Sequence, residues 1–476
     1  MTETRTDDEG FVDTVSRPET RGIELIGDAE RHGRARDLFF VWAAPNVSIL
    51  NLTVGATLIL LGLEVWQAVA VIIASQTLWV FPGIIAASGP AAGTSGSVIT
   101  RAMYGSIGNK LFVAFAGWLI GAAFLSLTWL ASSFTGADLL RRFGIDDPVL
   151  VPIAVTLVVS AVTVLVAIYG HALILRLYPI MSTAVFVIFL AVAGFILPTV
   201  DWQYSAPVPL SGVALWSSIT IGFTILASSP LSFINSPDFA RYLPRSTKPS
   251  HIATATALGG AIPSMVFTIV GVLLATGLTS AEFDAGIDVA LFDQLPRWLA
   301  PVLVIGVLIN TIALNAITAY SSSMSLQAIG FRLHRIPATI IVGIVGTALT
   351  IYLVLSTSLL AAVNLMLQFL LIVSGPAMAI FVVDLLLRRN VYVGHDLFDD
   401  GPDGEFWYTG GWSIAGIAAL VAGGFATAMC LATNVWAGPI ASAMGDVDLS
   451  VPAGMLVAAS VYVGIKKAGL GREARA

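Results

Sequence analysis

Charged residues are scarce in this chain. Asp, Glu, Lys and Arg together make up 11% of the 476 residues, whereas hydrophobic residues make up 57% and the mean hydropathy is +0.89. Soluble globular domains carry about 25% charged residues, because their surface must be solvated. The composition therefore excludes a soluble fold and indicates a protein whose solvent is the lipid bilayer.

Cysteine and histidine are also rare. Cys430 is the only cysteine, so the chain has neither a disulfide framework nor a cysteine-based metal site. The five histidines fall in segments expected at the cytoplasmic face or at its borders: His32, His171, His251, His334 and His395. A membrane-embedded transferase would need a catalytic base or a cluster of metal ligands. The lack of such a cluster argues against an enzyme.

Long uncharged runs are abundant, and a helix needs about 20 apolar residues to cross a bilayer. We predict twelve transmembrane helices, at residues 38–64, 66–89, 111–136, 149–169, 172–197, 213–236, 252–277, 298–326, 336–356, 358–388, 410–434 and 449–466. The first 37 residues are polar and lack the apolar core and cleavage site of a signal peptide. We interpret residues 1–37 and 467–476 as cytoplasmic tails and residues 390–409 as a cytoplasmic loop.

The distribution of Lys and Arg supports this count. With a cytoplasmic N-terminus, 20 of the 23 Lys and Arg residues fall on the cytoplasmic side, and only Arg141, Arg142 and Arg297 fall outside. This is the positive-inside bias of membrane proteins, and a missed or extra span would scramble it from that point on. We therefore expect a multi-pass protein of the cytoplasmic membrane with both termini inside.

Two of the predicted helices contain a proline beside small polar residues. Pro45-Asn46 lies early in the first helix, and Pro230 follows two serines in the sixth. Each alone is typical of an ordinary proline kink, although a helix in lipid is interrupted only where the freed backbone groups find partners. Together they mark the first helix of two five-helix groups. This pattern predicts inverted repeats at residues 38–198 and 213–389, with two added helices in residues 410–466.

Five stretches, each placed between the right helices, carry a family resemblance. They are Pro45-Asn46 with Val65-Trp66-Gln67-Ala68; Arg101 to Asn109; Ser236-Pro237-Asp238-Phe239-Ala240-Arg241-Tyr242; Asn315 to Ser321; and Asp384 with Arg388-Arg389. Between about residues 38 and 412 the chain thus resembles the nucleobase:cation symporter-1 family, the purine/cytosine permease-like transporters.

The resemblance implies an all-α membrane fold: a LeuT-like five-plus-five inverted repeat with two extra C-terminal helices. It also implies a secondary transporter that imports a small neutral heterocycle by alternating access, coupled to Na⁺ or H⁺. Purines, cytosine, hydantoins, allantoin and related vitamins are the expected substrates. It implies no cofactor beyond a coupling Na⁺, and we expect a monomer without a nucleic-acid partner. A non-transporting sensor or a channel on the same scaffold stays open, because a fold does not dictate function.

The helix interiors contain no charged side chain away from their ends, which favours an uncharged substrate held by amides, hydroxyls and an aromatic face. The amide candidates are Asn46, Asn310, Asn315, Asn364 and Gln368. Such residues also serve as hydrogen bonds between helices. Asn46 stands out because it lies at the break, and Asn315 because it begins a family-like stretch. The family commonly has a second asparagine where this chain has Thr318, which puts purine or cytosine specificity in doubt.

In the family, aromatic rings stack on the substrate. The third predicted helix offers Trp118 and Trp129, and we expect Trp118 to be the stacking residue, although tryptophan is also frequent near membrane interfaces. Near the end of the sixth helix, the family's aromatic position aligns with Ser232, and Phe233 beside it is expected to supply the second face.

The resemblance implies a cation site between the break in the first helix and the eighth helix. We expect backbone carbonyls near Ala44, Val47 and Ser48, with hydroxyls of Thr318, Ser321 and Ser322, to be its ligands. Uncharged oxygens suit sodium, although Asp238 or Glu64 near helix ends could carry a proton instead. Pro45, Pro230, Asp238 and Arg241 are interpreted as gating or structural residues, with the last two as a cytoplasmic gate or a loop-anchoring ion pair.

Overall fold

The computed structural model describes residues 14–279, 282, 287–356, 359–433 and 436–469, and this part of the chain is helical. The helices are α1 (Asp37–Asn46), α2 (Ile49–Leu60), α3 (Val65–Gln76), α4 (Val80–Ala86), α5 (Ser88–Ala92), α6 (Gly96–Ile99), α7 (Arg101–Tyr104), α8 (Ser106–Phe112), the π-helical η3 (Val113–Leu119), α9 (Ile120–Arg141), α10 (Leu150–Tyr169), α11 (His171–Ile196), α12 (Gly212–Leu231), α13 (Pro237–Ala240), α14 (Pro249–Thr276), α16 (Ile287–Gln294), α17 (Leu299–Ala328), α18 (Arg335–Leu355), α19 (Leu359–Leu387), α20 (Ile414–Cys430), α21 (Pro439–Ala443) and α22 (Ser450–Lys467).

Helices occupy all twelve predicted positions. Within the described residues, nine helical segments are long and apolar enough to cross a membrane, and α1 with α2 form a tenth if the pair is one span. α1 and α2 are bent by 58° at the predicted break. α20, with 17 residues, is shorter, and α22 falls outside the same criteria. The all-helical membrane fold is confirmed, and the count of twelve stays a prediction.

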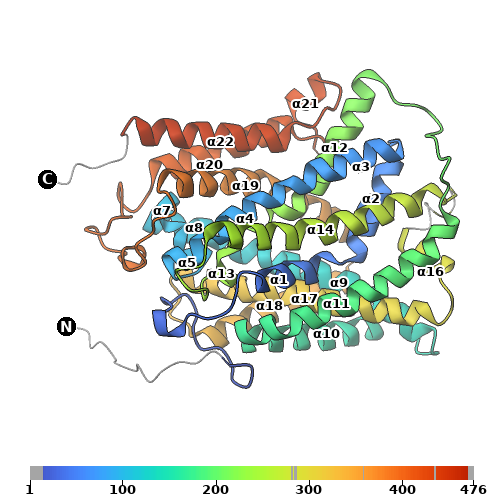
Figure 1. Ribbon diagram of the computed structural model, residues 1–476, viewed down its shortest axis with the longest axis horizontal. Coiled ribbons are helices and arrows are strands. Elements are labelled where there is room, and N and C mark those ends of the chain that lie inside the picture. The colour runs from blue at the N-terminus through green and yellow to red at the C-terminus, as the bar shows by residue number, and fades with distance from the viewer. Residues whose placement is uncertain (1–13, 280–281, 283–286, 357–358, 434–435, 470–476) are drawn as a thin grey trace.

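The helices form two groups, each taking corresponding members from both halves of the chain. In one group, α14 packs against α1, α2, α3 and α4, and α12 packs against α2 and α3. In the other group, α9, α10, α17 and α18 all pack against one another. The first and second spans of each half thus lie together, as do the third and fourth, which is the arrangement that an inverted repeat requires. Figure 1 shows α19, α20 and α22 along one edge of the bundle.

A glycine pair lets α2 and α14 cross closely. A Cβ atom on Gly271 would lie 2.0 Å from the carbonyl oxygen of Leu52, and one on Gly55 would lie 1.9 Å from that of Thr268. Small residues at such crossings allow backbones to approach, which is a main source of packing energy between membrane helices.

Gly271→Ala is expected to destabilise the protein by about 1–3 kcal/mol, because the added methyl group meets backbone atoms that cannot rotate away. Gly194→Ala in α11 is the matched control, since its Cβ would meet nothing within 4 Å. The measurement is the fraction of detergent-solubilised protein that stays monodisperse after heating. Equal thermal stability of the two variants would contradict close packing of α2 on α14.

Residues 14–36, which belong to the predicted cytoplasmic tail, lie against the ends of the helices. The backbone of this segment bonds to both halves of the chain: Glu19 N–H donates to the Ile168 carbonyl (3.1 Å), Ile26 N–H to that of Gly93 (2.8 Å) and His32 N–H to that of Tyr242 (2.7 Å). We call residues 14–36 the N-terminal strap. It lies at the same end of the bundle as α7, α13 and the loop after α19, with α16 at the opposite end (Figure 1).

Candidate substrate-binding site

A cavity of about 930 Å³, which includes space open to solvent, lies between the two helix groups. Its walls come from α6, η3 and the start of α9, the chain just after α12, α17 and α19. Pockets for small molecules often form between the helices of a bundle. The position of this cavity between the two repeats makes it the candidate substrate site.

One wall of the cavity is the seam between η3–α9 and α17, which run antiparallel. A Cβ on Gly117 would lie 2.3 Å from the Ser325 hydroxyl oxygen, and one on Gly121 would lie 2.1 Å from that of Ser322. Two glycines one turn apart therefore hold this seam narrow. Further along, the Thr128 hydroxyl donates to Asn315 Oδ1 at 2.7 Å.

Almost all the polar groups of the cavity are uncharged. Ser97, Thr100, Ser232, Asn235, Thr318, Ser321, Ser322, Ser325 and Ser374 line it, and Asp238 is the only ionisable residue among its described lining residues. Asn235 Oδ1 and Ser374 Oγ are buried without a hydrogen-bond partner among the described residues. Buried polar atoms are normally paired, so these two atoms are suited to a ligand's polar edge.

Three phenyl rings line the cavity. Phe112 comes from the end of α8, Phe124 from α9, and Phe233 follows α12. The Phe233 ring stacks on Trp79 at 5.2 Å between centroids and meets the edge of Trp42 at 4.9 Å, so it is held by its neighbours. Aromatic rings supply contact area to a flat heterocycle at low cost in side-chain entropy.

Side-chain amides hold the break between α1 and α2. Pro45 has no N–H, and Val47 and Ser48 leave the helical path. The Asn46 amide donates to the Trp42 carbonyl at 2.8 Å, and the Asn51 amide donates to the Asn46 carbonyl at 2.6 Å. From α17, the Asn310 amide donates to the carbonyls of Ala44 (2.9 Å) and Pro45 (3.1 Å). Four carbonyls at the break therefore accept hydrogen bonds from neutral amide donors: those of Trp42, Ala44, Pro45 and Asn46.

Asp238 lies in the short helix α13 at one end of the cavity and is 1% exposed. Its Oδ1 accepts a hydrogen bond from the Gly96 N–H at 2.8 Å. Burial raises the pKa of Asp238 to about 6, against the opposing effects of the Ser321 hydroxyl, the Gly96 N–H and the charges of Arg241 and Arg335. The pKa of Asp238 therefore lies well above that of a solvated aspartate.

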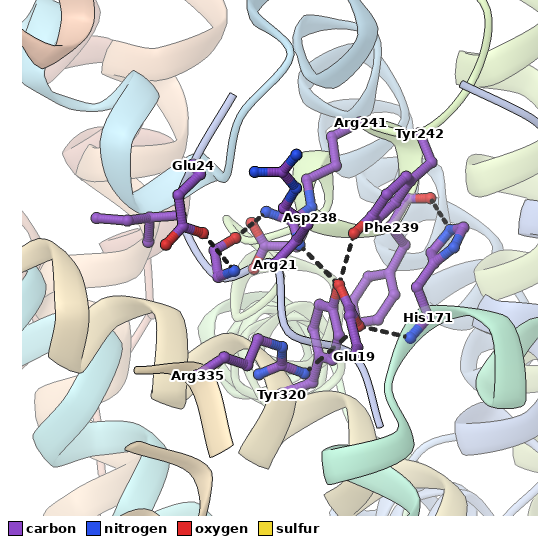
Figure 2. Close-up of polar contacts among 12 residues, drawn as sticks. Glu19, Arg21, Glu24, His171, Asp238, Phe239, Arg241, Tyr242, Tyr320 and Arg335 are labelled. Atoms are coloured by element: carbon purple, nitrogen blue, oxygen red, sulfur yellow. Dashed lines mark hydrogen bonds and ion pairs between the residues drawn. The ribbon is translucent and has the colours of Figure 1, made fainter. Parts of the chain in front are cut away.

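The carboxylate in contact with Arg241 is Glu19, from the N-terminal strap. Figure 2 shows the Glu19 side chain surrounded by groups from several helices. Glu19 Oε1 contacts Arg241 Nη2 at 3.1 Å and accepts from the Tyr242 hydroxyl at 2.7 Å and the Tyr320 hydroxyl at 3.0 Å. Its Oε2 accepts from the backbone N–H of His171 at 2.8 Å. The expected pairing of Asp238 with Arg241 is therefore replaced by a cluster centred on Glu19.

Residues 25–454 match the family described as permeases for cytosine/purines, uracil, thiamine and allantoin. The chain belongs to this family. It is 29% identical to the putative purine-cytosine permease YxlA of Bacillus subtilis over 96% of this chain and 97% of that one. It is 24% identical to the purine-cytosine permease FCY2 of Saccharomyces cerevisiae over 90% and 81% of the two chains. The recognised resemblance is confirmed: the protein is a transporter of the nucleobase:cation symporter-1 family and not an enzyme.

Among solved structures, the permease resembles Mhp1, a transporter of the same symport family, in a closed conformation with bromovinylhydantoin bound. The TM-score is 0.73, with 18% sequence identity, and the match covers 94% of both chains. At that identity the likeness shows the fold, which is the predicted five-plus-five architecture.

Neither predicted tryptophan lines the cavity of the permease. Trp118 packs against the apolar cluster of α9, α10 and α18, and Trp129 is fully buried there, with its indole N–H donating to Thr163 at 3.3 Å. Phe124 holds the cavity-facing position instead. Phe124 shares this helical stripe with Val113, Gly117 and Gly121, at ordinary i, i+3 and i, i+4 spacing, whereas Trp118 and Trp129 lie on other faces.

The predicted amide residues take different places. The Asn46 amide donates to a backbone carbonyl at the break between α1 and α2. Asn315 is fully buried beside Thr128, and its Nδ2 has no hydrogen-bond partner among the described residues. Neither is a lining residue of the cavity, whereas Thr318 and Phe233 are. The side chains of Asn364 and Gln368 lie outside the described part of the structure.

The structure does not gather the predicted cation ligands. Asn310 is the α17 residue at the break, and Thr318 lies eight positions further on, about 12 Å along a helix with a rise of 1.5 Å per residue. Thr318, Ser321 and Ser322 face the cavity, while the Ala44 carbonyl accepts the Asn310 amide. Val47 is buried in a cluster of apolar residues. The Asn310 amide thus occupies the carbonyls of Ala44 and Pro45, and the sodium site at the break stays a prediction.

Sequence reasoning missed Phe124, Ser374, Asn310's role at the break and Glu19. A signal for Phe124 was present: Gly117 and Gly121 form a small-xxx-small pattern opposite the serine-rich end of α17, which marks a close helix seam. For Glu19 there was no local signal, since it is one of several acidic residues in a polar segment.

Proposed function

We propose that the permease imports a small, uncharged, nucleobase-like heterocycle. The observation that supports this most is the cavity between the repeats, with three phenyl rings and neutral hydroxyl and amide groups. Asn235 Oδ1 accepts hydrogen bonds, and Ser374 Oγ can donate or accept, so together they match the mixed edge of a purine, cytosine, hydantoin or allantoin. The names of its relatives, purine-cytosine permeases, point to the same class.

The coupling ion in this proposal is the proton. A proton needs a titratable group that the cavity reaches, and Asp238 is that group among the described lining residues. A sodium ion at the break would have to displace the Asn310 amide from two carbonyls. The permease works as a monomer in the cytoplasmic membrane, with the N-terminal strap and the end of α22 on the cytoplasmic side.

The decisive experiment is accumulation of radiolabelled heterocycles by proteoliposomes that contain the purified permease. The panel is cytosine, uracil, adenine, hypoxanthine, allantoin, hydantoin and thiamine, with proton and sodium gradients imposed separately. We expect saturable uphill uptake of at least one compound under an inward proton gradient, and no stimulation when sodium replaces choline outside.

Liposomes without protein, and a proton ionophore, are the controls. Accumulation driven only by sodium would overturn proton coupling but not heterocycle transport. Failure of every compound to accumulate or exchange under either gradient would overturn the proposed substrate class.

A further inference from the structure

The N-terminal strap places one charged side chain deep among the helix ends. Glu19 is 1% exposed, although it lies 18 residues before α1 begins. The turn between α10 and α11 is shaped to receive it: Gly170 has φ +74°, and a Cβ there would lie 1.9 Å from Glu19 Oε2. A side chain at position 170 would therefore displace the carboxylate.

Glu19 shares its surroundings with two arginines that also face Asp238. Arg241 Nη2 lies 3.1 Å from Glu19 Oε1, and Arg335 Nη2 lies 3.6 Å from Glu19 Oε2. The positive charges of both arginines also act on the Asp238 carboxylate. Figure 2 shows Arg241 lying between Asp238 and the Glu19 side chain, with Arg335 below. Glu19 and Asp238 therefore share the same pair of positive charges.

The four buried charges balance. Glu19, Asp238, Arg241 and Arg335 are each no more than 1% exposed, and they carry two negative and two positive charges when both acids are ionised. Other titratable groups around them include the phenols of Tyr242 and Tyr320, which donate to Glu19. The imidazole of His171 stacks on Tyr242 at 4.3 Å, and that of His32 lies 5.5 Å from both rings. Charges are poorly screened in such a dry cluster. Loss of the Glu19 charge leaves an uncompensated positive charge beside Asp238.

We propose that Glu19 is a positioning residue of the transport site: through Arg241 and Arg335 it sets the proton affinity of Asp238. The N-terminal strap is then part of the transport machinery. This inference rests on the proposed role of Asp238 in proton coupling, but the proton affinity of Asp238 is measured without transport.

The test is the infrared carbonyl stretch of protonated Asp238 in the purified permease, followed as a function of pH. The band is assigned by its loss in Asp238→Asn. In Glu19→Gln the band is expected to disappear at a pH lower by about one unit or more, because unpaired arginines favour the carboxylate form. Glu19→Asp, which keeps the charge, is expected to restore most of the wild-type midpoint.

The matched control is Glu30→Gln, which breaks the strap's ion pair with Arg21 (2.6 Å) and does not touch the cluster. If Glu19 only anchored the strap, both glutamine variants would move the midpoint alike or not at all, and either result would overturn the inference. If the Glu19→Gln variant does not fold, the double variant Arg335→Gln/Glu19→Gln is compared with the single variant Arg335→Gln. The pH midpoint of the Asp238 band is expected to be lower in the double variant by a similar amount.

Uptake separates this inference from the proposed function. The pH profile of uptake is expected to move in the same direction as the band. If Glu19→Gln shifts the pH midpoint of the Asp238 infrared band but not the pH profile of uptake, the role of Glu19 is supported and proton coupling through Asp238 is refuted. An unshifted band would refute the role of Glu19 whatever the uptake shows.

Discussion

Asp238→Asn is expected to abolish proton-driven accumulation of substrate while leaving exchange of internal for external substrate intact. The variant keeps an oxygen acceptor for the Gly96 N–H but cannot take up a proton. Each pH unit of gradient supplies about 1.4 kcal/mol per proton, or about tenfold accumulation. With a gradient of two units, the accumulation ratio should fall from as much as about 100 to about 1.

The measurement compares uphill uptake with counterflow in the same proteoliposomes. Glu64→Gln is the control, because Glu64 was the other acid near a helix end. It accepts hydrogen bonds from Ser205 and from the Ala206 N–H, and it does not line the cavity. Uphill uptake that survives Asp238→Asn but not Glu64→Gln would place the coupling proton on Glu64.

Phe124→Ala is expected to weaken substrate binding about 10- to 100-fold. Stacking of a nucleobase on an aromatic side chain contributes about 1–3 kcal/mol, and each 1.4 kcal/mol changes the dissociation constant about tenfold. Phe124→Tyr keeps the ring and should bind nearly as well as the wild type. Trp118→Ala should leave the dissociation constant within about twofold, since Trp118 does not line the cavity.

Equilibrium binding of whichever labelled heterocycle the permease accumulates measures this contrast. A large loss of affinity in Trp118→Ala, with Phe124→Ala unaffected, would return the stacking role to the tryptophan that the sequence suggested. The substrate site would then lie outside the cavity between the two helix groups.

The positions of the helices were readable from the sequence because the bilayer imposes a simple rule. A segment must be apolar over about 20 residues, and every backbone group must be paired. The same rule made the prolines informative, and the break at Pro45-Asn46 is where α1 ends and the chain bends by 58°. Family motifs such as Asp238 to Tyr242 then identified the transporter class.

The side chains of the site were less predictable, because a helical pattern repeats and one turn of error changes the exposed residue. The third helix shows this: Phe124, and not Trp118, lies on the stripe with Gly117 and Gly121 that lines the cavity. The predicted hydroxyls of α17 are real cavity residues, but Asn310, more than two turns earlier, meets the break.

Hydropathy, positive charge and proline act locally along the chain, so the sequence by itself determined an all-helical membrane protein with a broken helix, and the family resemblance added the transporter class. Only the tertiary structure decided which groups meet. Glu19 lies 222 positions from Arg241 along the chain and 3.1 Å from it in space. A carboxylate in a polar segment has the same local signature whether it faces water or two buried arginines, and only packing of the strap against α11, α13, α17 and α18 distinguishes these two environments.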